Sequence, residues 1–110
     1  MIKGVHAMFN TAQAEELRAF LRDKLSFPYF DAGEGWLIFN APEVEVGCHP
    51  AASNSHDISF YCDDIEATVD ELKAKGVEFT KPIEDHGYGL VTFFSAPGGF
   101  EIQLYQAKYR

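Results

Sequence analysis

Four polar residues, His6, Glu45, Asp57 and Gln103, occupy matching places in a chain that repeats itself. The passage FNAPEVEV around Glu45 resembles FSAPGGFEIQL around Gln103, so these two residues correspond to each other. His6 and Asp57 each stand on the strand expected to open one copy of the repeat. Imidazole and carboxylate groups can transfer protons or bind cations, whereas a neutral amide cannot accept a substrate proton. The pattern indicates a site to which the two copies contribute different side chains.

Strand alternation predicts that these four side chains share one surface, because successive residues of a strand face opposite sides. In DISFYC the apolar residues share one face and leave Asp57 on the other. The same parity in VHAMF, EVEVGCH and FEIQLY leaves His6, Glu45 and Gln103 opposite the apolar face. Each residue alone could be a solvated polar group on the open side of a sheet. Their joint position in both copies favours a shared cleft.

Each half of the chain is predicted to contain one helix and four strands. Helical periodicity covers residues 12–25 and again the stretch DIEATVDELKAKG, with Asn10 expected to cap the first helix and Asp63 or Asp64 the second. In the first half, strands are expected at residues 5–9 and, after the FPYFDAGEG stretch, at 36–40 and 43–49. In the second half they are expected at residues 57–62, 77–83, 89–94 and 100–105. The sequence therefore predicts a single domain, 1–110, of two βαβββ modules at about 1–50 and 56–107.

Composition narrows the class of protein. The net charge of −8 disfavours nucleic-acid and membrane partners, because the phosphates of both would repel this chain. No apolar run is long enough to span a membrane, and the first residues lack a signal-peptide pattern, so a cytoplasmic location is expected. Cys48 and Cys62 are expected to be buried thiols. Trp36 is expected to be a packing residue, and lining of a pocket is the alternative.

The order of elements, with His6, DDIEATVDELKAKGVEF and SAPGGFEIQLY, resembles the vicinal oxygen chelate superfamily of glyoxalase I, extradiol dioxygenases, fosfomycin-resistance enzymes and bleomycin-resistance proteins. The resemblance implies an α+β fold in which two tandem βαβββ modules form an eight-stranded cleft, and a homodimer. It also implies a divalent metal ion (Zn, Ni, Mn or Fe) held by His6, Glu45, Asp57 and Gln103, with Glu45 as the catalytic residue that transfers a proton.

Two of these four positions depart from the usual ligands of that superfamily, which has a second histidine where Asp57 stands and a glutamate where Gln103 stands. A neutral amide oxygen is a weaker ligand for a hard cation than a carboxylate. A bulge could turn His56 inward in place of Asp57. Glu101 lies on the same face as Gln103, roughly 6–7 Å along the strand. Both alternatives stay open from the sequence.

Two functions of different classes follow. The first is a metal-dependent lyase, isomerase or dioxygenase in which the ion acts as a Lewis acid on a small substrate with vicinal oxygens. The alternative is a metal-free binding protein of bleomycin-resistance type that holds a cationic drug in an acidic, aromatic groove. A third possibility is a regulatory or scaffolding module whose cleft is filled by side chains.

Overall fold

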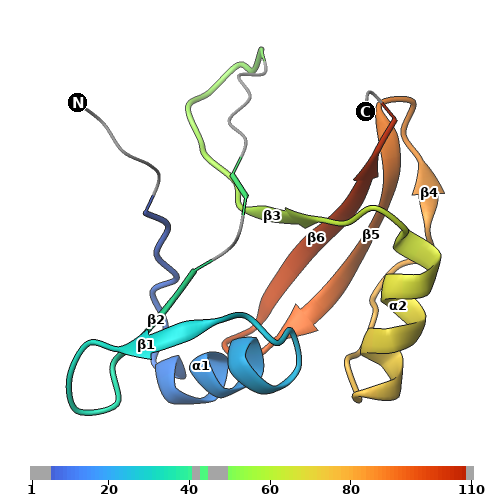
Figure 1. Ribbon diagram of the computed structural model, residues 1–110. Coiled ribbons are helices and arrows are strands. Elements are labelled where there is room, and N and C mark those ends of the chain that lie inside the picture. Colours follow the sequence, from blue (N-terminus) through green and yellow to red (C-terminus); the bar gives the residue numbers. More distant parts are fainter. Residues whose placement is uncertain (1–5, 41–42, 45–49, 109–110) are drawn as a thin grey trace.

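The fold is seen in a computed structural model of the chain, which describes residues 6–40, 43–44 and 50–108. These residues form two helices and six strands, and Figure 1 shows their arrangement. In chain order the elements are α1 (Ala14–Asp23), β1 (Tyr29–Asp31), β2 (Leu37–Phe39), β3 (Ser59–Tyr61), α2 (Ile65–Ala74), β4 (Glu84–Asp85), β5 (Gly89–Ala96) and β6 (Phe100–Ala107).

The second half of the chain is a complete βαβββ module. Its sheet has the order β3-β6-β5-β4, in which β3 runs parallel to β6 and the other neighbours are antiparallel. One face of this sheet is buried against the helices, through Phe94 of β5 and Ile102 and Leu104 of β6. Helix α2 contributes Ile65, Val69 and Leu72 to the same core, at the spacing that the sequence predicts. The α+β fold class is confirmed.

The first half contains α1 and the β1–β2 hairpin. Leu17 and Leu21 of α1 are buried in the core, as the periodicity predicts. The strand expected at residues 5–9 is not formed by residues 6–9, which lie outside any helix or strand. Only Phe9 of this segment is anchored in the core, with its ring edge-on to Phe100 at 5.1 Å between centroids. A strand requires a hydrogen-bonded neighbour, and the strand expected at 43–49 lies largely outside the described residues.

The two helix starts differ in how they are capped. Asp64 caps α2, because its side chain accepts a hydrogen bond from the backbone N–H of Ala67 at 3.1 Å. The prediction that Asn10 caps the first helix is wrong, since α1 begins at Ala14 and Gln13 holds the cap position. Thr11 sets this start, because its hydroxyl accepts from the N–H of Gln13 at 3.1 Å and closes a local turn.

The strand predicted at residues 77–83 is mostly absent, because the regular strand β4 lies at Glu84–Asp85. Around residue 79 the chain does pair with β5, through a single bridge between Phe79 and Phe94. Pro82 then interrupts the ladder, because proline has no N–H to donate. Beside this break, the buried hydroxyl of Thr92 links the two segments by donating to the Lys81 carbonyl at 2.7 Å.

The ends of the two helices are joined by a reciprocal contact, named here the lysine clasp. Each helix has lysine at its C-cap, Lys24 on α1 and Lys75 on α2, and these residues are 51 positions apart. The ammonium of Lys24 donates to the carbonyl of Lys75 at 2.6 Å, and that of Lys75 donates to the carbonyl of Lys24 at 3.4 Å. Lys75 also donates to the Ser26 hydroxyl at 3.0 Å. The clasp joins equivalent points of the two halves.

Candidate functional site

The open face of the four-stranded sheet is the candidate site. Gln103 pairs with Ser59 of β3 and with Phe93 of β5, and Tyr105 pairs with Tyr61 and Val91 in the same way. Directly paired residues project from the same side of a sheet. The side chains of Gln103, Tyr105 and Tyr61 therefore share the face opposite the helices, as the alternation of the sequence predicts.

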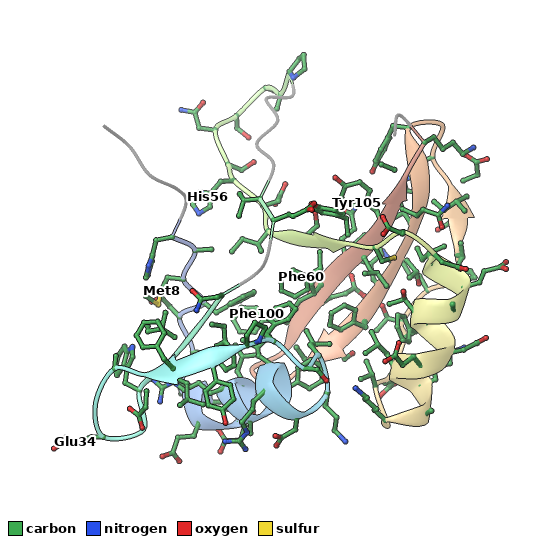
Figure 2. The ribbon with its side chains drawn as sticks, viewed as in Figure 1. Met8, Glu34, His56, Phe60, Phe100 and Tyr105 are labelled. Carbon is green, nitrogen blue, oxygen red and sulfur yellow. The ribbon has the colours of Figure 1, made fainter. Side chains whose placement is uncertain are left out.

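Three tyrosines gather around Gln103 on this surface, named here the tyrosine face (Tyr61, Tyr88, Gln103 and Tyr105). The rings of Tyr61 and Tyr105 lie 6.0 Å apart, and those of Tyr88 and Tyr105 lie 6.4 Å apart. The amide nitrogen of Gln103 donates to the Tyr88 hydroxyl at 3.4 Å. Figure 2 labels Phe100 and Tyr105 towards opposite ends of β6, so the tyrosines lie near the end of the chain's last strand.

Tyr88 reaches this face because the β4–β5 turn is held closely against β6. The N–H of His86 donates to the carbonyl of Gly89, and the N–H of Lys108 donates to the carbonyl of Tyr88, each at 2.9 Å. Gly89 is required here, since a Cβ at this position would lie 2.6 Å from the carbonyl oxygen of Gln106. The Tyr88 side chain is still 50% exposed, so it borders the face and remains accessible to a ligand.

Acidic groups border the tyrosine face. The Tyr61 hydroxyl donates to a carboxylate oxygen of Glu43, and Glu84 pairs with Val91 on the same side of the sheet. At the turn, Lys108 donates to the Asp85 carboxylate. This hydrogen bond from Lys108, followed by one from the N–H of Gly87, lowers the pKa of Asp85 below its usual range. The surroundings therefore combine aromatic rings with carboxylates.

Glu101, the alternative to Gln103, is held by other partners. Its carboxylate accepts a hydrogen bond from the Thr80 hydroxyl at 2.7 Å and lies 3.8 Å from the ammonium of Lys81. The same ammonium lies 4.4 Å from the centre of the Phe93 ring. These contacts tie Glu101 to the segment after α2, whereas Gln103 contacts Tyr88.

The predicted site residues are only partly brought together. Gln103 lies on the tyrosine face, while His6 is exposed in the segment before α1 and Asp57 is exposed two residues before β3. Glu45 lies outside the described residues. Within residues 6–40, 43–44 and 50–108, no three His, Cys, Asp or Glu side chains group so as to hold a metal ion. The four-residue metal site therefore stays a prediction.

The choice between His56 and Asp57 also stays open, because both are exposed in the stretch that leads into β3. Figure 2 labels His56 on this stretch, outside the sheet. Strand parity alone cannot orient a residue that is not yet paired with a neighbouring strand.

Other expectations about single residues have mixed outcomes. Cys62 packs against the core as expected, where burial raises the pKa of its thiol, and Cys48 lies outside the described residues. Trp36 is 51% exposed and packs against the guanidinium of Arg18, which lies 4.6 Å from the centre of its ring. Trp36 belongs to the loop that joins β1 to β2. Tyr61 and Tyr105 fall on the open face by parity, yet aromatic residues give no sequence signal that separates binding from packing.

No helix among the described residues is long and apolar enough to cross a membrane.

Comparison with known proteins gives the family. The sequence model of the Glyoxalase/Bleomycin resistance protein/Dioxygenase superfamily matches residues 4–104. No protein of curated function matches the sequence significantly. Among solved structures, TnmS3, an antibiotic binding protein from Streptomyces sp. CB03234, is 21% identical with a TM-score of 0.66, covering 89% of each chain. A superfamily member from Sphaerobacter thermophilus is 24% identical with a TM-score of 0.65, covering 96% of this chain and 98% of the other. A glyoxalase/bleomycin resistance protein/dioxygenase from Nocardioides is 17% identical with a TM-score of 0.62, covering 88% of this chain and 78% of the other. The chain belongs to the Glyoxalase/Bleomycin resistance protein/Dioxygenase superfamily.

Proposed function

We propose that this protein binds a small organic cation on the tyrosine face, as a binding protein of bleomycin-resistance type. The observation that carries the proposal is the gathering of Tyr61, Tyr88 and Tyr105 around Gln103 on one open sheet face. Aromatic rings attract cations through their electron-rich faces, and sets of them recognise quaternary ammonium groups. Gln103 supplies an uncharged hydrogen-bonding group at the centre of the set.

The charge of the molecule supports a cationic ligand. The chain carries 17 acidic and 9 basic residues, and Glu43 and Glu84 border the tyrosine face itself. A negative surface raises the local concentration of a positively charged ligand and accelerates its association. TnmS3, with which this chain shares its fold, is described as an antibiotic binding protein. That description agrees with a binding role for this surface.

Choline provides a direct test of the proposal by isothermal titration calorimetry. We expect choline to bind, and its uncharged carbon isostere, in which a quaternary carbon replaces the nitrogen, to bind at least tenfold more weakly. Replacing Tyr88 by Leu removes one ring and should weaken choline binding by roughly fivefold, because one cation–π contact contributes about 1 kcal/mol. Tyr88→Phe keeps the ring and should bind choline nearly as the parent does.

Tyr29→Leu is the matched control, because Tyr29 is a similarly exposed tyrosine on the other sheet. This variant should bind choline normally. Equal binding of choline and its uncharged isostere would contradict a cation site. Equal loss in Tyr29→Leu and Tyr88→Leu would contradict the placement of the site on the tyrosine face.

A metal-dependent enzyme is the second candidate function. His6 and Asp57 are 51 residues apart, which is also the spacing of the two clasp lysines, so the repeat supports equivalent roles for them. Gln103 pairs with Ser59, two residues after Asp57. A divalent ion held by His6, Glu45, Asp57 and Gln103 would supply Lewis-acid chemistry on a substrate with vicinal oxygens. Glu45 would then be the group that accepts the substrate proton.

Elemental analysis after incubation with Zn, Ni, Mn or Fe separates the two functions. Near one equivalent of bound metal that is lost in His6→Ala but kept in His86→Ala would support the metal site, since His86 is an exposed turn residue. Metal bound equally by both variants would contradict the assigned ligands. We expect a homodimer under either function. Light scattering should then give a mass in solution of twice the 12.3 kDa chain.

A further inference from the structure

An ammonium group lies on the open face of the four-stranded sheet, next to the tyrosine face. It belongs to Lys81 and lies 4.4 Å from the centre of the Phe93 ring. Phe93 is paired with Gln103, and directly paired residues project from the same side of a sheet. Since Gln103 also contacts Tyr88, a row of neighbours runs from the tyrosines through Gln103 and Phe93 to Lys81.

The Lys81 ammonium keeps its hydrogen-bond donors. It lies 3.8 Å from a carboxylate oxygen of Glu101, which is too long for a hydrogen bond. That carboxylate is held by the Thr80 hydroxyl instead, at 2.7 Å. Within residues 6–40, 43–44 and 50–108, the Lys81 ammonium donates no hydrogen bond. An ammonium has three donors, so this positive charge can still bind an anion.

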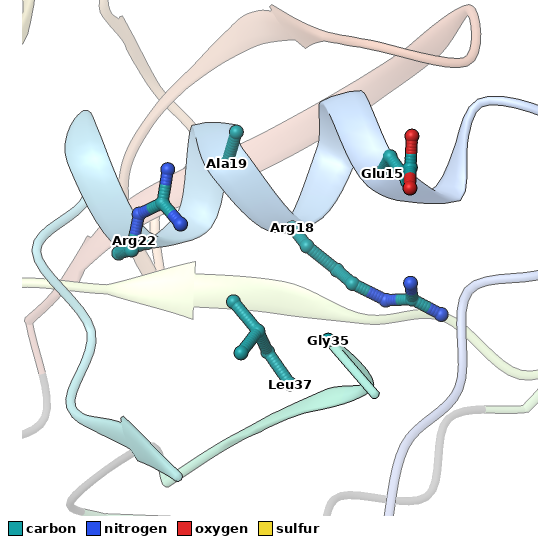
Figure 3. A pocket seen from close by; sticks show the side chains of 6 residues that line it. All are labelled: Glu15, Arg18, Ala19, Arg22, Gly35 and Leu37. Carbon is teal, nitrogen blue, oxygen red and sulfur yellow. The ribbon is translucent and has the colours of Figure 1, made fainter. Parts of the chain in front are cut away.

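Other cations of the described chain are directed elsewhere. Figure 3 shows the two arginines of α1, Arg18 and Arg22, pointing apart beside a depression between α1 and the loop before β2. One guanidinium lies over Trp36 and the other donates to Asp23. The lysine clasp occupies two further ammonium groups, and that of Lys108 donates to a carboxylate at the β4–β5 turn. None of these groups competes with Lys81 for an anion beside the tyrosines.

We propose that the tyrosine face binds a zwitterion, with a quaternary ammonium against the tyrosine rings and a carboxylate on the Lys81 ammonium. This inference rests on the proposed function, because it names the class of cation that the same site takes. A carboxylate accepts charge-assisted hydrogen bonds from an ammonium. Gln103 lies between the two charges of the ligand and, being uncharged, opposes neither.

The overall charge of the protein makes this preference diagnostic. A molecule of net charge −8 repels an added carboxylate in general, so it would favour a plain cation over a zwitterion. A preference for the zwitterion therefore requires a local positive charge at the site. Lys81 supplies that charge, and its half-exposed side chain remains accessible to a ligand.

The spacing of the rings from Lys81 sets the length of the ligand. Tyr105 and Gln103 are alternate residues of β6, which lie roughly 6–7 Å apart along a strand. Lys81 adjoins Phe93, the partner of Gln103 on the next strand. The ligand therefore needs a spacer between its charges, as in 6-(trimethylammonio)hexanoate. In glycine betaine the two charges are too close together to reach both groups.

Isothermal titration calorimetry with 6-(trimethylammonio)hexanoate and its methyl ester tests the inference, because the ester keeps the cation and loses the negative charge. We expect the parent to bind the zwitterion roughly fivefold more tightly than the ester. Lys81→Met keeps the apolar stem and should abolish this preference. Glu101→Gln removes the carboxylate that competes for Lys81 and should raise the preference about twofold. Such a gain cannot result from misfolding.

Two controls match these measurements. Lys73→Met removes an exposed lysine of α2, which packs on the opposite face of the sheet, and should keep the full preference for the zwitterion. Glycine betaine should bind to the parent no more tightly than its own methyl ester. A preference that is lost equally in Lys73→Met and Lys81→Met would show an effect of overall charge and overturn the inference.

The failure of this inference differs from that of the proposed function. If choline binds but the parent does not distinguish the zwitterion from its ester, or Lys81→Met keeps the preference, the zwitterion is refuted and the cation site stands. 7,7-Dimethyloctanoate keeps the carboxylate and has carbon in place of the quaternary nitrogen. If it binds as tightly as the zwitterion and is lost in Lys81→Met, the cation site is refuted, and the zwitterion with it.

Discussion

The lysine clasp gives a quantitative prediction about how the two halves of the chain are held together. Lys24→Met and Lys75→Met each remove one ammonium while keeping most of the apolar stem. The ammonium of Lys24 makes the shorter bond, 2.6 Å to the Lys75 carbonyl at the end of α2, and this contact is partly buried. The ammonium of Lys75 makes a longer bond to the Lys24 carbonyl, 3.4 Å, and one to Ser26 at 3.0 Å.

The expected cost follows from these geometries. A hydrogen bond from a charged donor contributes about 1.5–3 kcal/mol when buried, and a cation at a helix C-terminus adds roughly 0.3–1 kcal/mol. Because the clasp is only partly buried, we expect Lys24→Met to lower the free energy of unfolding by about 1.5 kcal/mol. Lys75→Met should cost about 1 kcal/mol, since its bonds are longer or go to an exposed hydroxyl.

Thermal unfolding measures this directly. For a chain of 110 residues, a loss of 1 kcal/mol lowers the melting temperature by about 4 °C. We therefore expect decreases of about 6 °C for Lys24→Met and about 4 °C for Lys75→Met. The two lysines contact each other in one hydrogen-bond network, so the loss in the double variant should differ from the sum of the two single losses.

Lys73→Met is the matched control, because Lys73 is an exposed lysine in the last turn of the same helix. It should change the melting temperature by less than about 2 °C. If Lys24→Met and Lys75→Met melt within that margin of the parent, the clasp does not stabilise the fold and the reasoning is refuted. If Lys73→Met loses as much as the two clasp variants, the effect is general loss of positive charge.

Two further predictions concern the turn that carries Tyr88. Gly89→Ala should destabilise the protein by about 2 kcal/mol or more, because its Cβ would lie 2.6 Å from the Gln106 carbonyl oxygen. Chemical denaturation measures this loss, and a value below about 0.5 kcal/mol would contradict the close approach. Asp85 has a lowered pKa in the folded state, so its pairing with Lys108 stabilises the fold above about pH 4 and is lost as the pH falls through the folded pKa. Asp85→Asn should therefore lower the melting temperature at pH 7 and leave it closer to the parent's at pH 2, and an equal difference at both pH values would contradict the linkage.

The sequence by itself determined the local features of this protein. The periodicity of Ile65, Val69 and Leu72 predicted the buried face of α2, and the pair Asp63-Asp64 marked its start, where the structure selects Asp64 as the cap. Alternation in FEIQLY correctly assigned Gln103 and Tyr105 to the open face of β6. These features could be predicted because they depend on residues within one or two turns of one another, and side-chain direction within an element follows from backbone geometry. Asn10 and Thr11 are neighbouring residues that can both hydrogen-bond to the backbone before α1, and there the prediction of Asn10 as the helix cap failed.

Only the tertiary structure decided which distant residues meet. The register that sets Ser59 beside Gln103 and Tyr61 beside Tyr105 brings together residues 44 positions apart, and no local pattern fixes such an offset. The lysine clasp depends on the C-terminal end of α1 meeting that of α2, and the contact of Arg18 with Trp36 depends on how the β1–β2 hairpin folds back. Such contacts arise from the packing of whole elements, because many side chains together determine a single arrangement. The local sequence around each residue therefore does not predict its distant partner.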